Sequence, residues 1–139
     1  YIYVDSPGGN VYSGFAIFDV IRFIKPAVKI IGTGLVASAA ALILLAAKKQ
    51  NRFALPNSHY LIHQPLSEMR GVATDLEIHA KEIERIKGRL NSIISKETGK
   101  SIEEVFKDTE RDYWLNAQEA LDYGLVSKII TTRKELTAK

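Results

Sequence analysis

The length and composition of the chain fit one globular domain. Its 139 residues lie in the range that one hydrophobic core usually organises, with 46% hydrophobic and 25% charged residues. The absence of cysteine excludes disulfides, thiolate metal sites and a cysteine nucleophile. The net charge of +3 is spread along the chain, which argues against a nucleic-acid partner, and the apolar run at residues 35–47 is too short for a membrane span.

The first half of the chain predicts alternating strands and helices. Apolar alternation marks the strands, and proline and glycine clusters mark the turns between elements. The expected elements are a strand at residues 1–4, a helix at 13–24, a strand at 28–31 ended by the glycines at 32–34, a helix at 38–49, and strands at 52–55 and 58–63.

The second half begins with a long predicted helix from Thr74 to about Thr98. Thr74 and Glu77 have the spacing of a capping box, and Gly99 supplies a left-handed stop. A helix of about 35 Å is too long for one small domain to cover, so we expect its apolar stripe to pack against another subunit. That stripe consists of Leu76, Ile83, Ile86 and Leu90.

Further helix starts at Ser101 and Asn116 and a strand at residues 126–131 complete the pattern. The tail from Thr132 to Lys139 is expected to be loose. Repeated βα units joined by right-handed crossovers predict an α/β fold with helices around a largely parallel sheet.

Ser38 stands where a strand and a glycine turn pass into a helix, among small neighbours. At such a junction the helix start offers free amides to a developing oxyanion, so a serine there suits nucleophilic attack. Serine is also a common helix cap, and this segment alone favours the cap.

A nucleophilic serine needs a base, and His63 at a strand end is the best candidate. His59 shares its strand face, so the two histidines also fit a metal pair, although no acidic residue falls within that strand. His79, inside the long helix, is expected to be solvated or at an interface. An acid that orients His63 would come from the three acidic residues within 108–112.

Residues 5–9 form a glycine-containing turn after the first strand. The turn lacks the lysine of a nucleotide-binding loop and the spacing of a dinucleotide fingerprint. Its adjacent glycines suit a turn whose backbone amide points into a site, as an oxyanion hole requires.

Six short motifs occur in one order along the chain. They are Ser-Pro-Gly-Gly from residue 6, Gly-x-x-Ala-Ser from residue 34, Arg-Phe-x-Leu-Pro-Asn from residue 52, Ile-His-Gln-Pro from residue 62, Ala-Thr-Asp-x-Glu-Ile from residue 73 and Asp-Thr-Glu-Arg-Asp from residue 108. This order, with its spacings from residue 1 to about residue 131, resembles the ClpP family, the proteolytic subunits of the Clp protease.

The resemblance implies a crotonase-like (ClpP-like) α/β fold with a protruding helical handle. It implies one serine peptidase domain over residues 1–139, without the family's N-terminal axial segment. Ser38, His63 and Asp112 fall on the family's nucleophile, base and orienting acid. The backbone amides of Gly9 and Ala39 fall on its oxyanion hole. No metal or cofactor is expected in this subunit, because ATP is used by the partner ATPase.

The resemblance also implies partners. Two stacked heptameric rings would enclose the sites, with the handle pairing the rings through the stripe named above. A hexameric Clp-type AAA+ ATPase would feed unfolded proteins and dock at an apolar cleft holding Tyr1, Tyr3 and Phe23, for which an ordinary place in the core is the alternative. The expected location is the bacterial cytoplasm, or an organelle matrix if a transit peptide was removed.

The chain departs from the family's pattern after the serine, where Ala39 and Ala40 replace a methionine followed by glycine or alanine. Peptide preference is therefore left open. One alternative is a catalytically inactive ClpP-like ring subunit, although such subunits typically lack a triad residue and this chain retains all three. An enoyl-CoA hydratase-type enzyme shares the fold but uses carboxylates, and none is placed beside Gly9 or Ala39.

Overall fold

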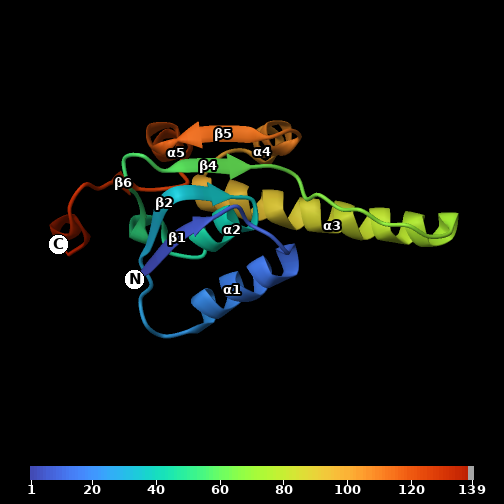
Figure 1. Ribbon diagram of the computed structural model, residues 1–139, viewed down its shortest axis with the longest axis horizontal. Helices are drawn as coiled ribbons and strands as arrows, with labels where there is room; N and C mark the ends of the chain where they lie inside the picture. The colour runs from blue at the N-terminus through green and yellow to red at the C-terminus, as the bar shows by residue number, and fades with distance from the viewer. Residues whose placement is uncertain (138–139) are drawn as a thin grey trace.

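The structure, a computed structural model, describes residues 1–137 as one sheet surrounded by helices (Figure 1). Its elements, in chain order, are β1 (Ile2–Ser6), α1 (Val11–Phe23), β2 (Ile30–Ala37), α2 (Ala39–Leu44), η1 (Lys49–Asn51), β3 (Arg52–Ala54), β4 (His59–Ile62), α3 (Ala73–Thr98), α4 (Ile102–Thr109), β5 (Tyr113–Asn116), α5 (Ala117–Tyr123), β6 (Lys128–Ile129) and η2 (Arg133–Leu136), where η marks a short 3₁₀ helix.

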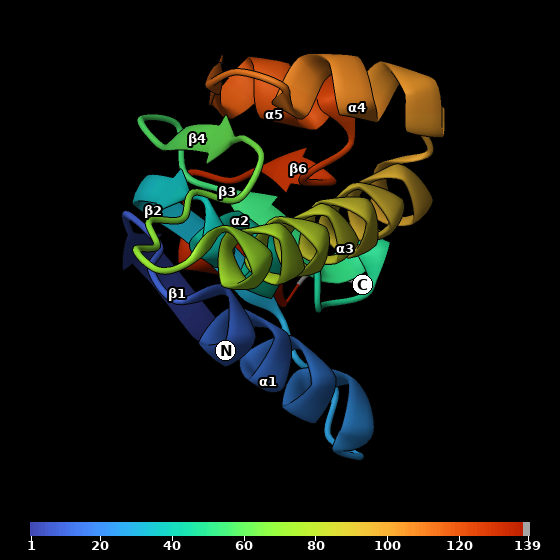
Figure 2. The same ribbon diagram turned by 90° about the vertical axis from the view of Figure 1, so that its right-hand side faces the viewer.

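The sheet has six strands in the order β5-β4-β2-β3-β6, and β1 pairs with β2 outside this path. All pairs are parallel except β4 with β5, which are antiparallel. The short helix α2 is almost wholly buried next to the sheet, with α1 packed on it. The views at right angles place α1 at one end of the molecule and α4 and α5 at the other (Figures 1 and 2). The expected α/β fold with a protruding helix is confirmed.

Strand β2 runs through the glycines at residues 32–34, which were expected to end it. The β1–β2 register shifts between Val4 and Ser6. At this irregularity Asp5 Oδ1 accepts a hydrogen bond from the backbone N–H of Leu35, at 2.9 Å. A side-chain acceptor therefore supports the irregular part of the strand, and β2 continues to the residue before Ser38.

Helix α2 has six residues, so the expected helix at residues 38–49 is wrong in length. The backbone carbonyls that follow it bind arginine side chains. The carbonyl of Leu45 accepts from Arg22 at 2.9 Å, and the carbonyl of Ala47 accepts from Arg52 Nε at 3.0 Å. Arginine side chains thus satisfy carbonyls that a longer α-helix would have bonded to its next turn.

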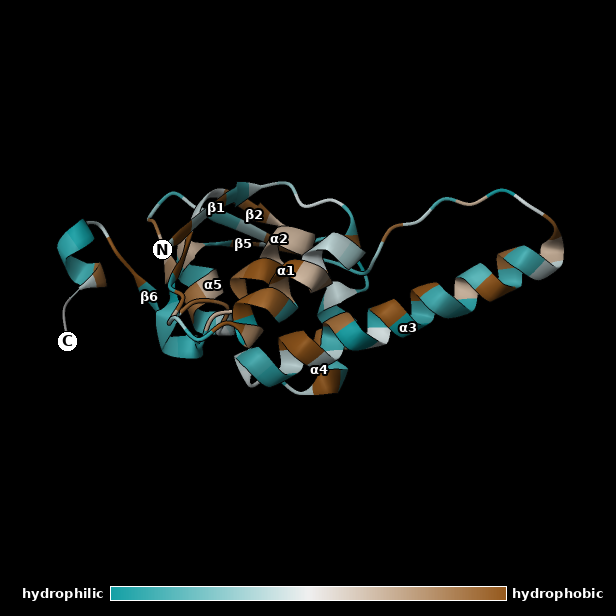
Figure 3. Ribbon diagram, turned by 90° about the horizontal axis from the view of Figure 1, so that it is seen from below, coloured by the Kyte–Doolittle hydropathy of each residue, from teal (hydrophilic) through white to brown (hydrophobic). Residues whose placement is uncertain are grey.

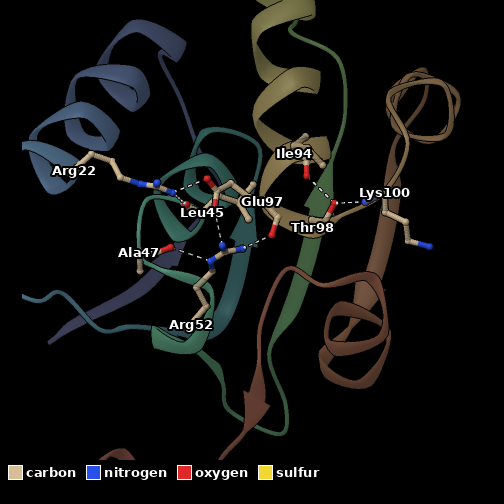
Figure 4. A network of polar contacts seen from close by, with 8 residues as sticks. All are labelled: Arg22, Leu45, Ala47, Arg52, Ile94, Glu97, Thr98 and Lys100. Carbon is tan, nitrogen blue, oxygen red and sulfur yellow. Dashed lines mark hydrogen bonds and ion pairs between the residues drawn. The ribbon is translucent and has the colours of Figure 1, made fainter.

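The same two arginines meet Glu97 near the end of α3, as Figure 4 shows. Glu97 pairs with Arg22 at 2.7 Å and with Arg52 at 2.6 Å. The Arg52 side chain is only 1% exposed, and burial lowers its pKa while the charge of Glu97 raises it. This ion triad joins α1, β3 and the base of α3.

Helix α3 has 26 residues and projects well beyond the sheet (Figures 1 and 3). Its N-cap is Val72 and no side chain caps it, so the expected capping box of Thr74 and Glu77 does not form. Gly99 ends the helix in the left-handed region, as expected. The helix starts at Ser101 and Asn116 are also confirmed, since each side chain accepts the expected backbone hydrogen bond.

Two further differences concern the last part of the chain. Strand β5 was not expected at all. The tail expected to be loose forms η2 over part of its length, where Leu136 is buried in a small apolar cluster. Residues 138–139 of that tail lie outside the described residues. Within residues 1–137, no helix combines the length and apolarity needed to cross a bilayer.

Candidate active site

Ser38 occupies the junction between β2 and α2 in a strained backbone conformation. Its φ of 56° and ψ of −121° make it the one non-glycine residue with positive φ among residues 1–137. Ser38 occupies the N-cap position of α2, but its side chain makes no capping hydrogen bond, so its hydroxyl does not serve as a helix cap. Such strain costs about 1–3 kcal/mol and persists where the surrounding structure enforces it.

The turn after β1 packs directly against this serine. Gly8 has φ +93°, and a Cβ added there would lie 2.6 Å from the carbonyl oxygen of Ala37 and 2.8 Å from Ser38 Cβ. The turn is held by Ser6 Oγ, which accepts from the N–H of Gly8 at 3.1 Å. Only glycine fits where the turn comes this close to Ala37 and Ser38. The next residue, Gly9, lines the same cavity as Ser38.

His63 and Asp112 lie together beyond the ends of two antiparallel strands. The β4–β5 ladder ends at the pair of Ile62 and Tyr113, so His63 and Asp112 are the next residues to face each other. His63 Nδ1 lies 3.3 Å from Asp112 Oδ1. The histidine side chain is 11% exposed and the aspartate 63% exposed. Asp112 therefore approaches the imidazole from the solvent side.

Ser38 and His63 line one cavity of about 450 Å³, together with Gly9 and Ala39. Within residues 1–137, no hydrogen bond joins Ser38 Oγ to His63. Most of the other walls are apolar. They come from α1, α2, the segment after β4, and α3, which supplies Ile83, Ile86, Leu90 and Ile94.

The same cavity shows how the predicted apolar stripe of α3 lies within the single chain. Ile86 is 5% exposed and packs with Phe15 and Leu42, while Ile83 and Leu90 are partly buried against the same cluster. The chain covers most of this face itself, because α1 and α2 lie next to it. Leu76, 39% exposed, is the most open of the four predicted residues, and the pairing of this stripe with another subunit stays a prediction.

The predicted aromatic surface residues are exposed. Tyr1 is 62%, Tyr3 57% and Phe23 89% exposed, so their alternative interpretation as core aromatics is wrong. Of the other two histidines, His59 does not line the cavity and His79 does. His59 Nδ1 is 3.2 Å from the carbonyl oxygen of Asn57, and His79 Nε2 is 2.6 Å from Ser67 Oγ at the edge of the cavity. Among residues 1–137, no three His, Asp or Glu side chains are grouped to hold a metal ion.

Gln64 is a residue near the site that the sequence analysis did not single out. Its side-chain Nε2 donates to the carbonyl of Glu110 at 2.7 Å, and its backbone N–H donates to the carbonyl of Thr109 at the same distance. Its position directly after His63 in the Ile-His-Gln-Pro motif was the only signal, and the partner segment is remote in sequence.

Comparisons with known proteins find close relatives of this chain. The family model described as Clp protease matches residues 1–133. The ATP-dependent Clp protease proteolytic subunit 2 of Treponema denticola is 61% identical over 139 residues, covering all of this chain and 70% of that protein. The protein of the same name from Pseudomonas aeruginosa is 54% identical over 137 residues, covering 99% of this chain and 68% of that one.

A solved structure extends the agreement to the fold. A ClpP1 mutant from Listeria monocytogenes is 51% identical and superimposes with a TM-score of 0.91, covering 97% of this chain and 75% of that one. The matches span nearly the whole of this chain. The chain therefore belongs to the Clp protease family.

Proposed function

We propose that this chain is a serine endopeptidase subunit of a Clp protease, with Ser38 as nucleophile, His63 as base and Asp112 as the acid that orients the imidazole. One observation carries the proposal. A strained serine shares a cavity with a histidine whose Nδ1 lies 3.3 Å from a carboxylate oxygen. That arrangement matches the roles of a serine triad.

In the proposed reaction, His63 Nε2 takes the proton of Ser38 Oγ as the oxygen attacks a peptide carbonyl. The tetrahedral intermediate collapses to an acyl-enzyme when His63 returns the proton to the leaving amine. Water then attacks the ester by the same route and releases the acid. Asp112 fixes the tautomer that carries a proton on Nδ1 and stabilises the imidazolium, while remaining ionised itself.

The backbone amides of Gly9 and Ala39 are proposed to bind the developing oxyanion. Both residues line the cavity beside Ser38. Among residues 1–137, neither N–H takes part in a described hydrogen bond to protein, which leaves both donors for a ligand. Because the donors belong to the backbone, Ala39 can serve in this role in place of the methionine typical of the family.

The apolar walls of the cavity favour a peptide with an apolar side chain next to the scissile bond. No cofactor is needed for this chemistry, and ATP would be used only by the partner ATPase.

The assembly we propose is two stacked heptameric rings that work with a hexameric Clp-type AAA+ ATPase on unfolded proteins. Among the exposed large apolar side chains, two sets suit these partners. Along the far part of α3 and the segment before it, they are Leu66, Val72, Leu76 and Ile78, which suit pairing of rings. At the other surface Tyr1, Tyr3 and Phe23 suit docking of the ATPase. Bacterial cytoplasm is the proposed location, since the relatives named above are bacterial.

A fluorophosphonate probe tests the proposed nucleophile, because only an activated serine reacts with it. We expect the folded chain to be labelled on Ser38, and we expect Ser38→Ala to lose both labelling and hydrolysis of a fluorogenic peptide. Unchanged hydrolysis by Ser38→Ala would disprove the assignment. A folded, assembled wild type that neither labels nor cleaves would instead favour the inactive ring subunit.

A further inference from the structure

The proposed acid, Asp112, is less firmly placed than the other members of the triad. Ser38 follows a buried strand and His63 follows β4, but Asp112 lies in the connection between α4 and β5. Its side chain is 63% exposed, so neighbouring side chains do little to confine it. The distance from His63 to Asp112 therefore depends on what holds the backbone just before Asp112.

Gln64 holds that backbone from the side of His63. Its N–H and its Nε2 each donate a 2.7 Å hydrogen bond, to the carbonyls of Thr109 and Glu110 respectively. These bonds lie past the last pair of the β4–β5 ladder, where no strand pairing continues. They therefore join the residue after the base to the residues that lead to the acid.

Helix α3 also holds this segment. Thr109 Oγ1, fully buried, donates to Asn91 Oδ1 at 2.8 Å, and Glu110 Oε2 pairs with Lys87 Nζ at 2.9 Å. The segment is thus fixed between α3 and Gln64. Of these two supports, Gln64 is the one adjacent in sequence to His63.

We propose that Gln64 is a positioning residue, whose side-chain amide fixes the Glu110 carbonyl and so sets Asp112 against the imidazole of His63. The inference rests on the proposed triad. Any residue except proline at this position would retain the backbone bond to Thr109, but only a side chain with an N–H donor of this length retains the bond to Glu110. A misplacement of about 1 Å in such a site costs roughly a hundredfold in rate.

The test compares Gln64→Met, which keeps the length but has no donor, with Gln118→Met. Gln118 is exposed, whereas Gln64 is half-buried, and it likewise donates one side-chain hydrogen bond, to Asp122 on α5. With the full chain and a short fluorogenic peptide, we expect Gln64→Met to lower kcat by about 10- to 100-fold and leave KM within about twofold. Gln118→Met should change neither, and Gln64→Glu should resemble Gln64→Met.

A double-mutant cycle separates positioning from a loss of stability. If Gln64 acts through Asp112, Gln64→Met should cost less than about twofold when Asp112→Asn is already present. If Gln64→Met lowers kcat in the Asp112→Asn variant as much as it does in the wild type, the inference is overturned. So would a fall in kcat that tracks a lower urea midpoint or a smaller assembly in both Gln64 variants.

The two levels of proposal can fail separately. Wild-type turnover by Ser38→Ala would defeat the proposed triad and the inference with it. Loss of turnover in Ser38→Ala together with wild-type kcat in Gln64→Met would defeat the inference alone.

Discussion

His63 Nδ1 and Asp112 Oδ1 lie 3.3 Å apart because β4 and β5 run antiparallel and end at the preceding pair. The last backbone pair of the ladder, Ile62 with Tyr113, sets the next residue of each segment opposite the other. Their side chains then meet on one side of the sheet edge, beside the cavity that holds Ser38.

Asp112→Asn should lower kcat for a short peptide by about 10⁴-fold, because the amide favours the wrong imidazole tautomer while the fold is kept. Steady-state kinetics measure the effect. Asp122→Asn, at an exposed carboxylate on α5, is the matched control and should retain wild-type kcat. A loss of less than tenfold in Asp112→Asn would argue against an orienting role.

Gly8→Ala should destabilise the fold by about 1–3 kcal/mol and sharply reduce peptide turnover. Its φ of +93° is unfavourable for alanine, and the added Cβ would lie 2.6 Å from the Ala37 carbonyl oxygen next to Ser38. Gly88→Ala is the control. That helical glycine has no atom within 4 Å of an added Cβ, so the change should stabilise by about 0.5–1 kcal/mol. Urea unfolding would measure the change in stability of each variant. The same change in both variants would contradict the prediction.

Glu97→Gln should destabilise the fold by on the order of 3–5 kcal/mol, because it leaves the buried guanidinium of Arg52 without its carboxylate. Urea unfolding would measure the change. Glu82→Gln removes an exposed partner of Arg85 and should cost less than about 0.5 kcal/mol. Similar losses in the two variants would show that burial of Arg52 does not depend on Glu97.

Leu76→Glu combined with Ile78→Glu should disperse the proposed assembly without unfolding the chain. These side chains are 39% and 62% exposed, so a charge there meets solvent in the separated chain and a partner's apolar surface in the assembly. Sedimentation velocity would measure the size. Ile86→Glu is the contrasting variant, because it places a charge in the chain's own core and should lower the unfolding midpoint. An unchanged sedimentation coefficient in the double variant would remove this surface from the interface.

Glu135 should stabilise the end of the chain in a pH-dependent way. Its carboxylate accepts hydrogen bonds from the backbone N–H groups of Thr131 and Thr132, which lower its pKa to about 2. A lowered pKa in the folded state means that the stabilisation is complete above the unfolded value of about 4.3 and is lost as the pH falls toward 2. The urea midpoints of wild type and Glu135→Gln should therefore differ at pH 7 and converge near pH 2. A constant difference over that range would contradict this account.

Local signals in the sequence were enough to predict most of the helices. The caps at Ser101 and Asn116 and the stop at Gly99 involve residues within one helical turn, so their physics is contained in the local sequence. The same holds for most of the strands, whose apolar runs are continuous. The prediction of a single α/β domain depended on these elements and their order.

The sequence by itself determined which residues are available for chemistry and in what order, through Ser38, His63, Asp112 and the glycine turn. Tertiary structure decided how they meet. Strand β5 pairs with β4 and buries one of its four side chains, and its apolar run of three residues is too short to predict a strand between two helices. The burial of Ile86 depends likewise on α1 and α2. Contacts between segments remote in sequence stabilise the strand and the buried side chain, and the local sequence does not contain those contacts.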